Sequence, residues 1–237
     1  MIQSYFFDLY GTLVDIRTDE SLPVLWKRMA LLLSLQGAEY APGELKRAYG
    51  SQVAEQTEKR AAQMPSVLKA HVEPDILEVF AALYAQKGIA AGADMVRDAA
   101  LFFRTLSLER IRLYPYAKSV LRTLRAGGRR VYLLSNAQAA FTVPELHKLG
   151  LASLFDGIVL SSDVGVRKPD KAIFEYALTR YGLFAGTCLM IGNDGEADMA
   201  GAAAVGMDGR YIHTDQSPRR GPLPAGCREI RSLLELL

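Results

Sequence analysis

The chain has 237 residues, of which 50% are hydrophobic and 23% are charged. This composition is typical of one large or two modest globular domains and excludes disordered and fibrous architectures. The 28 lysines and arginines nearly balance the 26 aspartates and glutamates and leave a formal net charge of +2, so we expect no nucleic-acid partner. No apolar run reaches the roughly 20 residues that a membrane-spanning helix needs. With only two cysteines, we expect a cytoplasmic protein that has no membrane association, disulfide framework or structural zinc.

The first expected element is a short buried strand from Ile2 to Asp8, which is aromatic and β-branched and ends in an acid before Gly11-Thr12. A long helical region follows, because apolar residues recur at three- and four-residue spacing from Leu22 to Leu33. Proline and glycine residues then separate further helical patterns. These patterns cover approximately residues 42–63, 74–87 and 93–108.

After Pro115 helices and short apolar strands alternate, which is the pattern of a parallel sheet covered on both faces. The first strand is too apolar to stand alone and is expected to join this sheet. We therefore predict an α/β fold with a Rossmann-like parallel-sheet core, formed by residues 1–14 and 113–237, and an inserted α-helical cap at residues 15–112. The expected core helices are 116–126, 138–149, 170–181 and 196–205, and the strands that follow them are 130–134, 157–160, 187–191 and 210–212.

Polar residues follow several of the predicted strands. In open α/β sheets the ligand crevice lies beyond the carboxyl ends of the strands, so these residues are expected to converge on one edge. The set comprises Asp8, Tyr10, Gly11 and Thr12 after the first strand, Ser135-Asn136 after the second, Lys168 after the third, and Asn193-Asp194 with Asp198 after the fourth.

Two carboxylates that face a lysine are suited to an aspartate nucleophile balanced by a cation. Asp8 is already ionised at neutral pH and needs no base, but it repels an anionic substrate. Mg²⁺ held between Asp8 and Asp194 would cancel that repulsion and stabilise the transition-state charge. Lys168 and the hydroxyl groups of Thr12 and Ser135 would donate hydrogen bonds, and the backbone N–H groups of Gly11 and Asn136 would add more. The implied cycle is acyl phosphate formation followed by hydrolysis.

Together these motifs, in this order, resemble the four motifs of the haloacid dehalogenase superfamily of hydrolases. The resemblance covers the whole chain and includes a helical cap inserted after the first motif, as in subfamily I. It implies that Asp8 is the nucleophile, that Thr12 and Ser135 bind the transferred group, and that Lys168 orients Asp8. It also implies that Asp194 and Asp198 form the acidic motif on the metal side. The motifs as they stand here are Asp8-Leu9-Tyr10-Gly11-Thr12-Leu13, Ser135-Asn136, Lys168-Pro169-Asp170 and Gly192-Asn193-Asp194 with Asp198.

One position departs from the phosphatases of this superfamily, which usually carry a second aspartate two residues after the nucleophile as general acid and base. This chain has Tyr10 there. A phenol with a pKa near 10 donates a proton but is a poor base at neutral pH. Its main-chain carbonyl still suits a metal ion. We therefore include Tyr10 both among the catalytic candidates, with Asp8 and Lys168, and among the metal ligands, with Asp8, Asp194 and Asp198.

Tyrosine at this position resembles the haloacid dehalogenases themselves, which use no metal, and Leu25-Trp26-Lys27 faintly resembles a Leu-Trp-Arg segment in their caps. Two features favour the phosphatases instead. Asp194 adds a negative charge that suits Mg²⁺, and Phe174 lacks the hydroxyl expected of a dehalogenase at that position.

Three hypotheses follow. The leading one is Mg²⁺-dependent hydrolysis of a small-molecule phosphomonoester through an aspartyl-phosphate. The alternatives are a metal-independent 2-haloacid dehalogenase and a non-catalytic binding module that has kept the fold. In the first two cases the partner is a small, anionic substrate selected by the cap. The oligomeric state stays open between monomer and homodimer.

Overall fold

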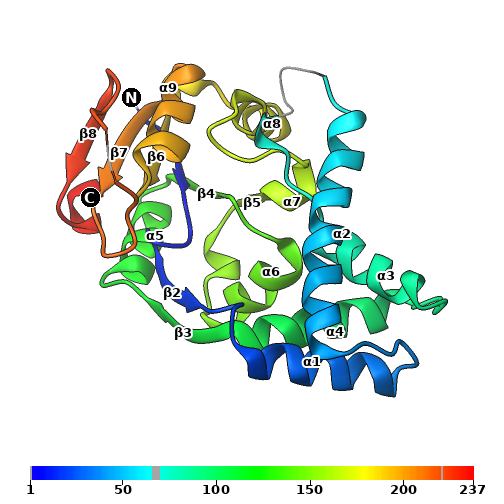
Figure 1. Cartoon of the computed structure of the whole chain (residues 1–237). Helices are drawn as coiled ribbons and strands as arrows, with labels where there is room; N and C mark the ends of the chain where they lie inside the picture. Colours follow the sequence, from blue (N-terminus) through cyan, green and yellow to red (C-terminus); the bar gives the residue numbers. More distant parts are fainter. Residues whose placement is uncertain (1, 66–69, 220) are drawn as a thin grey trace.

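A parallel sheet forms the centre of the computed structural model, which describes residues 2–65, 70–219 and 221–237 (Figure 1). Within these residues the sheet has six strands in the order β5-β4-β1-β6-β7-β8. All neighbouring strands in it pair in parallel. This arrangement confirms the predicted α/β fold. The strands are β1 (Ser4–Phe7), β4 (Arg130–Ser135), β5 (Gly157–Leu160), β6 (Cys188–Gly192), β7 (Asp208–Ile212) and β8 (Cys227–Ile230).

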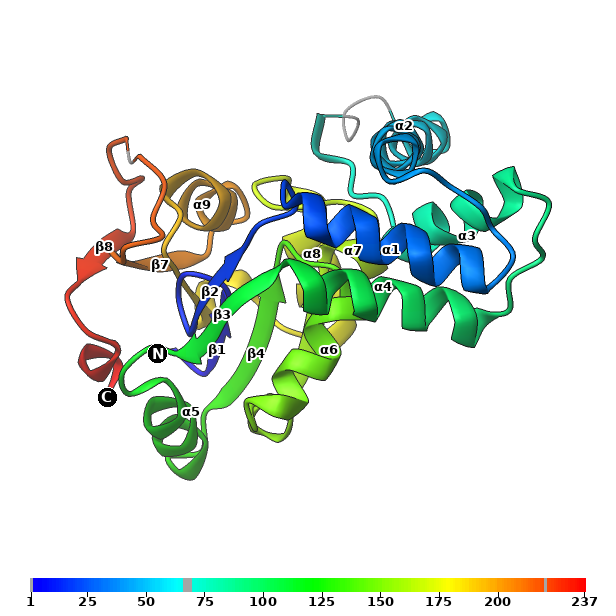
Figure 2. The same cartoon turned by 60° about the horizontal axis from the view of Figure 1, so that its bottom comes forward.

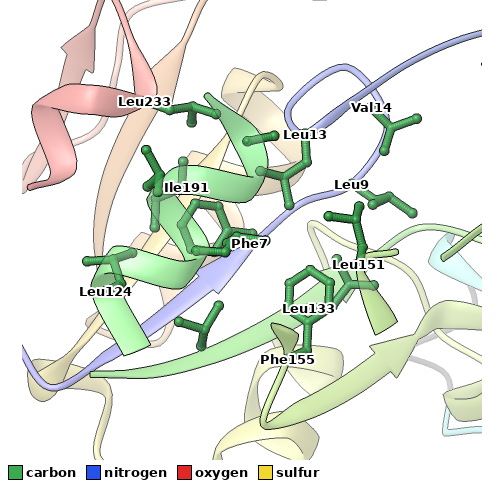
Figure 3. Packing of buried hydrophobic residues seen from close by; sticks show 14 of the residues in the cluster. Phe7, Leu9, Leu13, Val14, Leu124, Leu133, Leu151, Phe155, Ile191 and Leu233 are labelled. Carbon is green, nitrogen blue, oxygen red and sulfur yellow. The ribbon is translucent and has the colours of Figure 1, made fainter. Parts of the chain in front are cut away.

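Side chains of β1 pack on both faces of the sheet. Phe7 is level with Leu133 of β4 and Ile191 of β6, and the three side chains lie in one buried cluster (Figure 3). Phe6 lies in a second cluster, which contains Tyr132 and Met190. Because successive side chains of a strand point to opposite faces, β1 is fully buried and its carboxyl end lies in the middle of the sheet.

Helices cover the two faces. Helices α5 (Ala117–Ala126) and α6 (Ala139–Lys148) pack with Phe7 and Leu133. Helix α8 (Lys171–Tyr181), a π-helical turn (Gly195–Ala200) and α9 (Gly201–Ala204) pack with Phe6. A short helix, α7 (Ser161–Val164), follows β5 directly. Each of these elements connects parallel strands or follows one, so the loops at the carboxyl ends of the strands are brought to one edge.

The cap consists of α1 (Pro23–Leu35), α2 (Pro42–Ala62), α3 (Ile76–Gln86) and α4 (Ala93–Ser107). These helices have their own apolar core, in which Trp26, Phe80 and Phe103 pack together. Figure 2 shows the cap beside the sheet, joined to it by an antiparallel pair of strands, β2 (Val14–Thr18) and β3 (Leu108–Leu113), which we call the ribbon. Within the described part of the chain, no helix combines the length and apolarity that crossing a membrane requires.

The two strands of the ribbon were not predicted from the sequence. Residues 15–112 were predicted to be helical almost throughout, but β2 and β3 form an antiparallel pair. Each strand is short, and β3 continues directly from α4, so hydrophobic periodicity did not separate it from the helix. Strand β8 was also missed because its segment, Cys-Arg-Glu-Ile, is an edge strand that buries only Ile230.

Candidate active site

Asp8 directly follows β1 at the centre of the sheet, and only 7% of it is exposed. Its Oδ1 accepts hydrogen bonds from Lys168 Nζ at 2.8 Å and Ser135 Oγ at 3.1 Å. Its Oδ2 accepts one from Thr12 Oγ1 at 3.1 Å. Three predicted site residues from three separate motifs therefore contact the predicted nucleophile and hold its carboxylate in a defined orientation.

Lys168 is buried beside Asp8. Its Nζ donates to Asp8 Oδ1, to Asp198 Oδ1 at 2.6 Å and to the Leu134 carbonyl at 2.8 Å. Burial alone would lower the pKa of Lys168, but Asp198 and Asp8 outweigh it and raise the pKa above its usual value. The ammonium group stays charged and compensates the two carboxylates.

Both carboxylate oxygens of Asp198 accept hydrogen bonds from other residues. Oδ1 accepts the Lys168 bond, and Oδ2 accepts a hydrogen bond from the Asp194 backbone N–H at 3.0 Å. Burial raises the pKa of this carboxyl, and Lys168 opposes that effect. Asp198 was predicted as a metal ligand, and the structure places its carboxylate against Lys168 and the Asp194 backbone.

Asp194 occupies the N-cap of the π-helical turn. Its Oδ1 accepts hydrogen bonds from the backbone N–H groups of Glu196 at 2.8 Å and Ala197 at 2.9 Å. These N-cap hydrogen bonds fix the side chain through Oδ1 and leave Oδ2 without a hydrogen bond from the described residues.

Gly11 has a different role from the predicted one. Its backbone N–H donates to the Val14 carbonyl at 2.8 Å, so it is not free to bind substrate. Gly11 has a φ of +84°, and a Cβ atom there would lie 2.2 Å from Asn193 Nδ2. The tight turn and the close approach of Asn193 therefore require glycine at this position.

Thr12 and Asn136 were predicted to bind substrate, and both contact other site residues. Thr12 Oγ1 lies 3.1 Å from Asp8 Oδ2 and 3.3 Å from Asn193 Oδ1. Asn136 Nδ2 donates to the Lys168 carbonyl at 2.9 Å, and Asn136 Oδ1 accepts from the Lys168 backbone N–H at 2.7 Å. This reciprocal pair fixes the loop that carries Lys168.

The Tyr10 side chain is held by the neighbouring helix α6 and by the cap. Its hydroxyl donates to Glu145 Oε2 at 2.5 Å and lies 3.0 Å from Thr142 Oγ1. Glu145 Oε1 accepts a hydrogen bond from Arg104 Nε at 2.6 Å. Burial and the adjacent Glu145 raise the pKa of Tyr10 above its ordinary value, so this phenol keeps its proton and is a poor donor as well as a poor base.

Four further side chains contact the site residues and had no role predicted from sequence: Glu145, Arg104, Thr142 and Asn193. Asn193 lies between Gly192 and Asp194 in a motif already predicted to belong to the site, so its position in the sequence could have identified it as a site residue. Glu145 and Arg104 lie on α6 and α4, and nothing in the local sequence of either helix shows that they meet.

The site residues surround a cavity of about 140 Å³, lined by Asp8, Tyr10, Ser135, Asn136, Lys168, Asn193, Asp194, Ala197 and Asp198. The described residues contain no group of three His, Cys, Asp or Glu side chains placed to hold a metal ion. Mg²⁺, however, is usually bound by one or two carboxylates together with water and substrate oxygens. Asp8, Asp194 and the Tyr10 carbonyl form a donor set of that type, so the residues present fit this ion.

A model of the haloacid dehalogenase-like hydrolase family matches residues 2–206. The chain belongs to this family. It is 30% identical over 206 residues to a phosphoglycolate phosphatase of Yersinia pseudotuberculosis serotype I, and the match covers 86% of this chain and 78% of the relative. The chain spans less than half the length of several other curated relatives, which are three phosphatases and a nucleotidase.

Solved structures of this family share the fold. A 2-haloacid dehalogenase from Pseudomonas syringae superposes with a TM-score of 0.64 at 22% identity, over 100% of this chain and 96% of that one. YfnB from Bacillus subtilis, whose structure has magnesium bound, superposes with a TM-score of 0.56 at 24% identity, over 99% and 96%. At these identities, the similarity establishes the architecture and not the activity.

Proposed function

We propose that this hydrolase cleaves a small-molecule phosphomonoester through an aspartyl-phosphate on Asp8, with Mg²⁺ bound by Asp8, Asp194 and the Tyr10 carbonyl. The observation that carries the proposal is the placement of Asp194 on the same cavity as Asp8, with one carboxylate oxygen free. Without a metal ion, the negative charge of Asp194 on this cavity would repel an anionic substrate. Magnesium would neutralise these acids and the phosphoryl oxygens.

In this proposal each side chain of the site has a task. Lys168 and Ser135 donate to Asp8 Oδ1 and Thr12 lies against Oδ2, so the carboxylate is oriented before substrate binds. A carboxylate oxygen of Asp8 attacks phosphorus as the bond to the alcohol oxygen breaks, and the departing alkoxide takes a proton from solvent water. Water then attacks the aspartyl-phosphate, which releases phosphate and restores the carboxylate. Lys168 keeps its charge throughout and offsets the negative charge that develops nearby.

Tyr10 takes no proton-transfer step in this proposal. Its hydroxyl donates to Glu145, which is in turn paired with Arg104. Transfer of the Tyr10 proton to a leaving group would place a phenolate against a buried carboxylate. We assign Tyr10 to the metal site through its carbonyl and to packing through its side chain, which differs from the proton donor that the sequence alone made possible.

The curated relatives support phosphoryl chemistry. One relative aligned over most of its length is named as a phosphoglycolate phosphatase. Among the solved structures, YfnB has magnesium bound. The small cavity and the cap are consistent with a compact anionic substrate.

A panel of small phosphate esters, assayed with added Mg²⁺ and again with a chelator, tests the proposal. We expect at least one ester to be hydrolysed, with the activity abolished by chelation and restored by Mg²⁺. An Asp194→Asn variant should need more Mg²⁺ for half-maximal activity. The absence of turnover on any ester, or turnover indifferent to chelation, would contradict it.

The dehalogenase alternative depends on Tyr10, and other parts of the structure do not support it. Lys27, the counterpart suggested for a halide-binding arginine, is exposed and lines a separate cavity on α1 with Val24 and Tyr40. Phe174 is buried in the sheet core. Halide release from 2-chloropropionate in the presence of a chelator would establish this alternative, and its absence over hours would remove it.

A non-catalytic binding module is the third hypothesis. The nucleophile, lysine and both acids are present and in contact or on one cavity, which favours an enzyme. The module would be supported if a phosphate ester bound saturably and the wild-type protein did not convert it to product at any Mg²⁺ concentration.

A further inference from the structure

A second cavity lies at the carboxyl edge of the sheet, on the far side of the turn that follows the nucleophile. Its volume is about 420 Å³, within the usual range for small-molecule sites. It shares no lining residue with the cavity at Asp8. The lining consists of Thr12, Tyr114, Pro115, Tyr116, Ile212, His213, Thr214, Arg231, Ser232 and Leu233.

This cavity sits where the ribbon to the cap joins the core. Thr12 lies just before β2, and Tyr114 lies just after β3. The opposite wall comes from residues that follow β7 and β8. The Thr214 hydroxyl donates to the Gly11 carbonyl at 2.7 Å, and Tyr114 donates to Asp215 at 2.5 Å. These hydrogen bonds link the two walls of the cavity, so its shape is fixed by the fold of the core.

The lining defines a ligand chemistry. Rings are supplied by Tyr114, Tyr116 and His213, and the apolar side chains of the lining are Pro115, Ile212 and Leu233. Such walls bind a planar ring by stacking and burial. The cation is Arg231, whose side chain is exposed and forms no ion pair or hydrogen bond with the described residues. A free guanidinium beside an apolar pocket matches the bidentate geometry of a carboxylate.

Tyr116 provides a separate observation. Its φ is +66°, the only positive value among the described residues other than glycine, and 54% of the residue is exposed. A left-handed tyrosine is rare because its Cβ crowds the backbone. Tyr116 also precedes the first turn of α5, where the helix dipole favours an anion. Backbone strain at an exposed aromatic residue on a cavity wall is typical of ligand sites.

We propose that this cavity is a second binding site, separate from the catalytic one, for a small aromatic anion. The ring lies between the tyrosines and the apolar wall, and the anionic group pairs with Arg231 at the first turn of α5. No covalent step is involved, and the proposal does not depend on which reaction Asp8 catalyses.

Benzoate is the test probe, with benzyl alcohol as the uncharged comparator and acetate as the comparator without a ring. Titration of the protein, followed by amide NMR shifts, should show saturable benzoate binding at Tyr116, Thr214 and Leu233. We expect benzyl alcohol and acetate to bind about tenfold or more weakly. Shifts confined to the cavity at Asp8, or equal affinities for the three probes, would overturn the proposal.

Two variants and a control separate the site from general effects. Arg231→Gln should weaken benzoate binding about tenfold, whereas Arg122→Gln, on the exposed side of α5, should leave it unchanged. Tyr116→Gly removes the ring and accepts the positive φ, so it should fold normally and still bind benzoate more weakly. Wild-type affinity in both cavity variants would contradict the assignment. Asp8→Asn should bind benzoate as the wild type does, because the two sites are distinct.

Discussion

Gly11→Ala tests the turn that holds the nucleophile. Gly11 has a φ of +84°, and a methyl group there would lie 2.2 Å from Nδ2 and 2.8 Å from Cγ of Asn193. Accommodating it requires Asn193 to move and to give up its contact with Thr12 Oγ1 at 3.3 Å. The substitution therefore combines backbone strain with a steric clash inside the active site.

The expected cost follows from these parts. Left-handed backbone in a non-glycine residue costs about 1–2 kcal/mol, overpacking costs about 1–3 kcal/mol, and loss of the hydrogen bond costs about 0.5–1.5 kcal/mol. We expect Gly11→Ala to lower the free energy of unfolding by about 2.5–6.5 kcal/mol in total. Gly88 is the matched control, because its φ is +76° and a Cβ there meets nothing within 4 Å. Gly88→Ala should cost only about 1–2 kcal/mol.

Urea-induced unfolding of the wild type and both variants measures these costs. A double-mutant cycle with Asn193→Ala removes all three atoms that the new methyl group would meet. In that background, Gly11→Ala should cost no more than Gly88→Ala does in the wild type. Equal costs for the two glycine variants, or a cost that Asn193→Ala leaves unchanged, would refute the argument from close approach.

Three further outcomes are expected. Tyr10→Phe should change kcat by less than about threefold, measured on the active ester, whereas a proton donor would give a loss of about 100-fold or more. Lys168→Met should lower kcat by at least about 100-fold and destabilise the fold by about 3–5 kcal/mol, because Asp8 and Asp198 lose their buried cation; near-wild-type values in both assays would contradict this role. The arginines of β3 outweigh burial and lower the pKa of Asp15. The stability that this carboxylate contributes is therefore present above about pH 4 and lost below it, and the gap in urea midpoint between wild type and Asp15→Asn should narrow as the pH falls from about 5 to about 3.

The sheet was predictable from sequence because its strands are short apolar segments separated by amphipathic helices. This pattern is typical of a parallel sheet with helices on both faces. Phe6 and Phe7 show why β1 belongs in the middle, since both faces of this strand are apolar and buried. The ribbon was not predictable in the same way. Strand β2 alternates apolar and polar side chains only from Val14 to Arg17, and its buried Asp15 is held by arginines of β3 and by Gln216. This alternation is too short to identify the strand from periodicity alone.

The convergence of Asp8, Ser135 and Lys168 could be anticipated because each lies at or beyond the carboxyl end of a parallel strand. The roles of their partners could not. Whether Asp198 faces a metal ion or a lysine depends on side-chain direction, which motif spacing does not specify. The environment of Tyr10 depends on Glu145, and thus on how α6 packs beside the cap helix that carries Arg104.

Direct detection of phosphorylated Asp8 tests the central claim. The protein is mixed with the ³²P-labelled ester that it hydrolyses in the panel, quenched in acid during turnover, and digested for peptide mapping. We predict that the label is found on the peptide that contains Asp8 and is absent from the Asp8→Asn protein, which should not turn the ester over. Rapid hydrolysis of the ester with no label on Asp8, or undiminished hydrolysis by Asp8→Asn, would contradict the account.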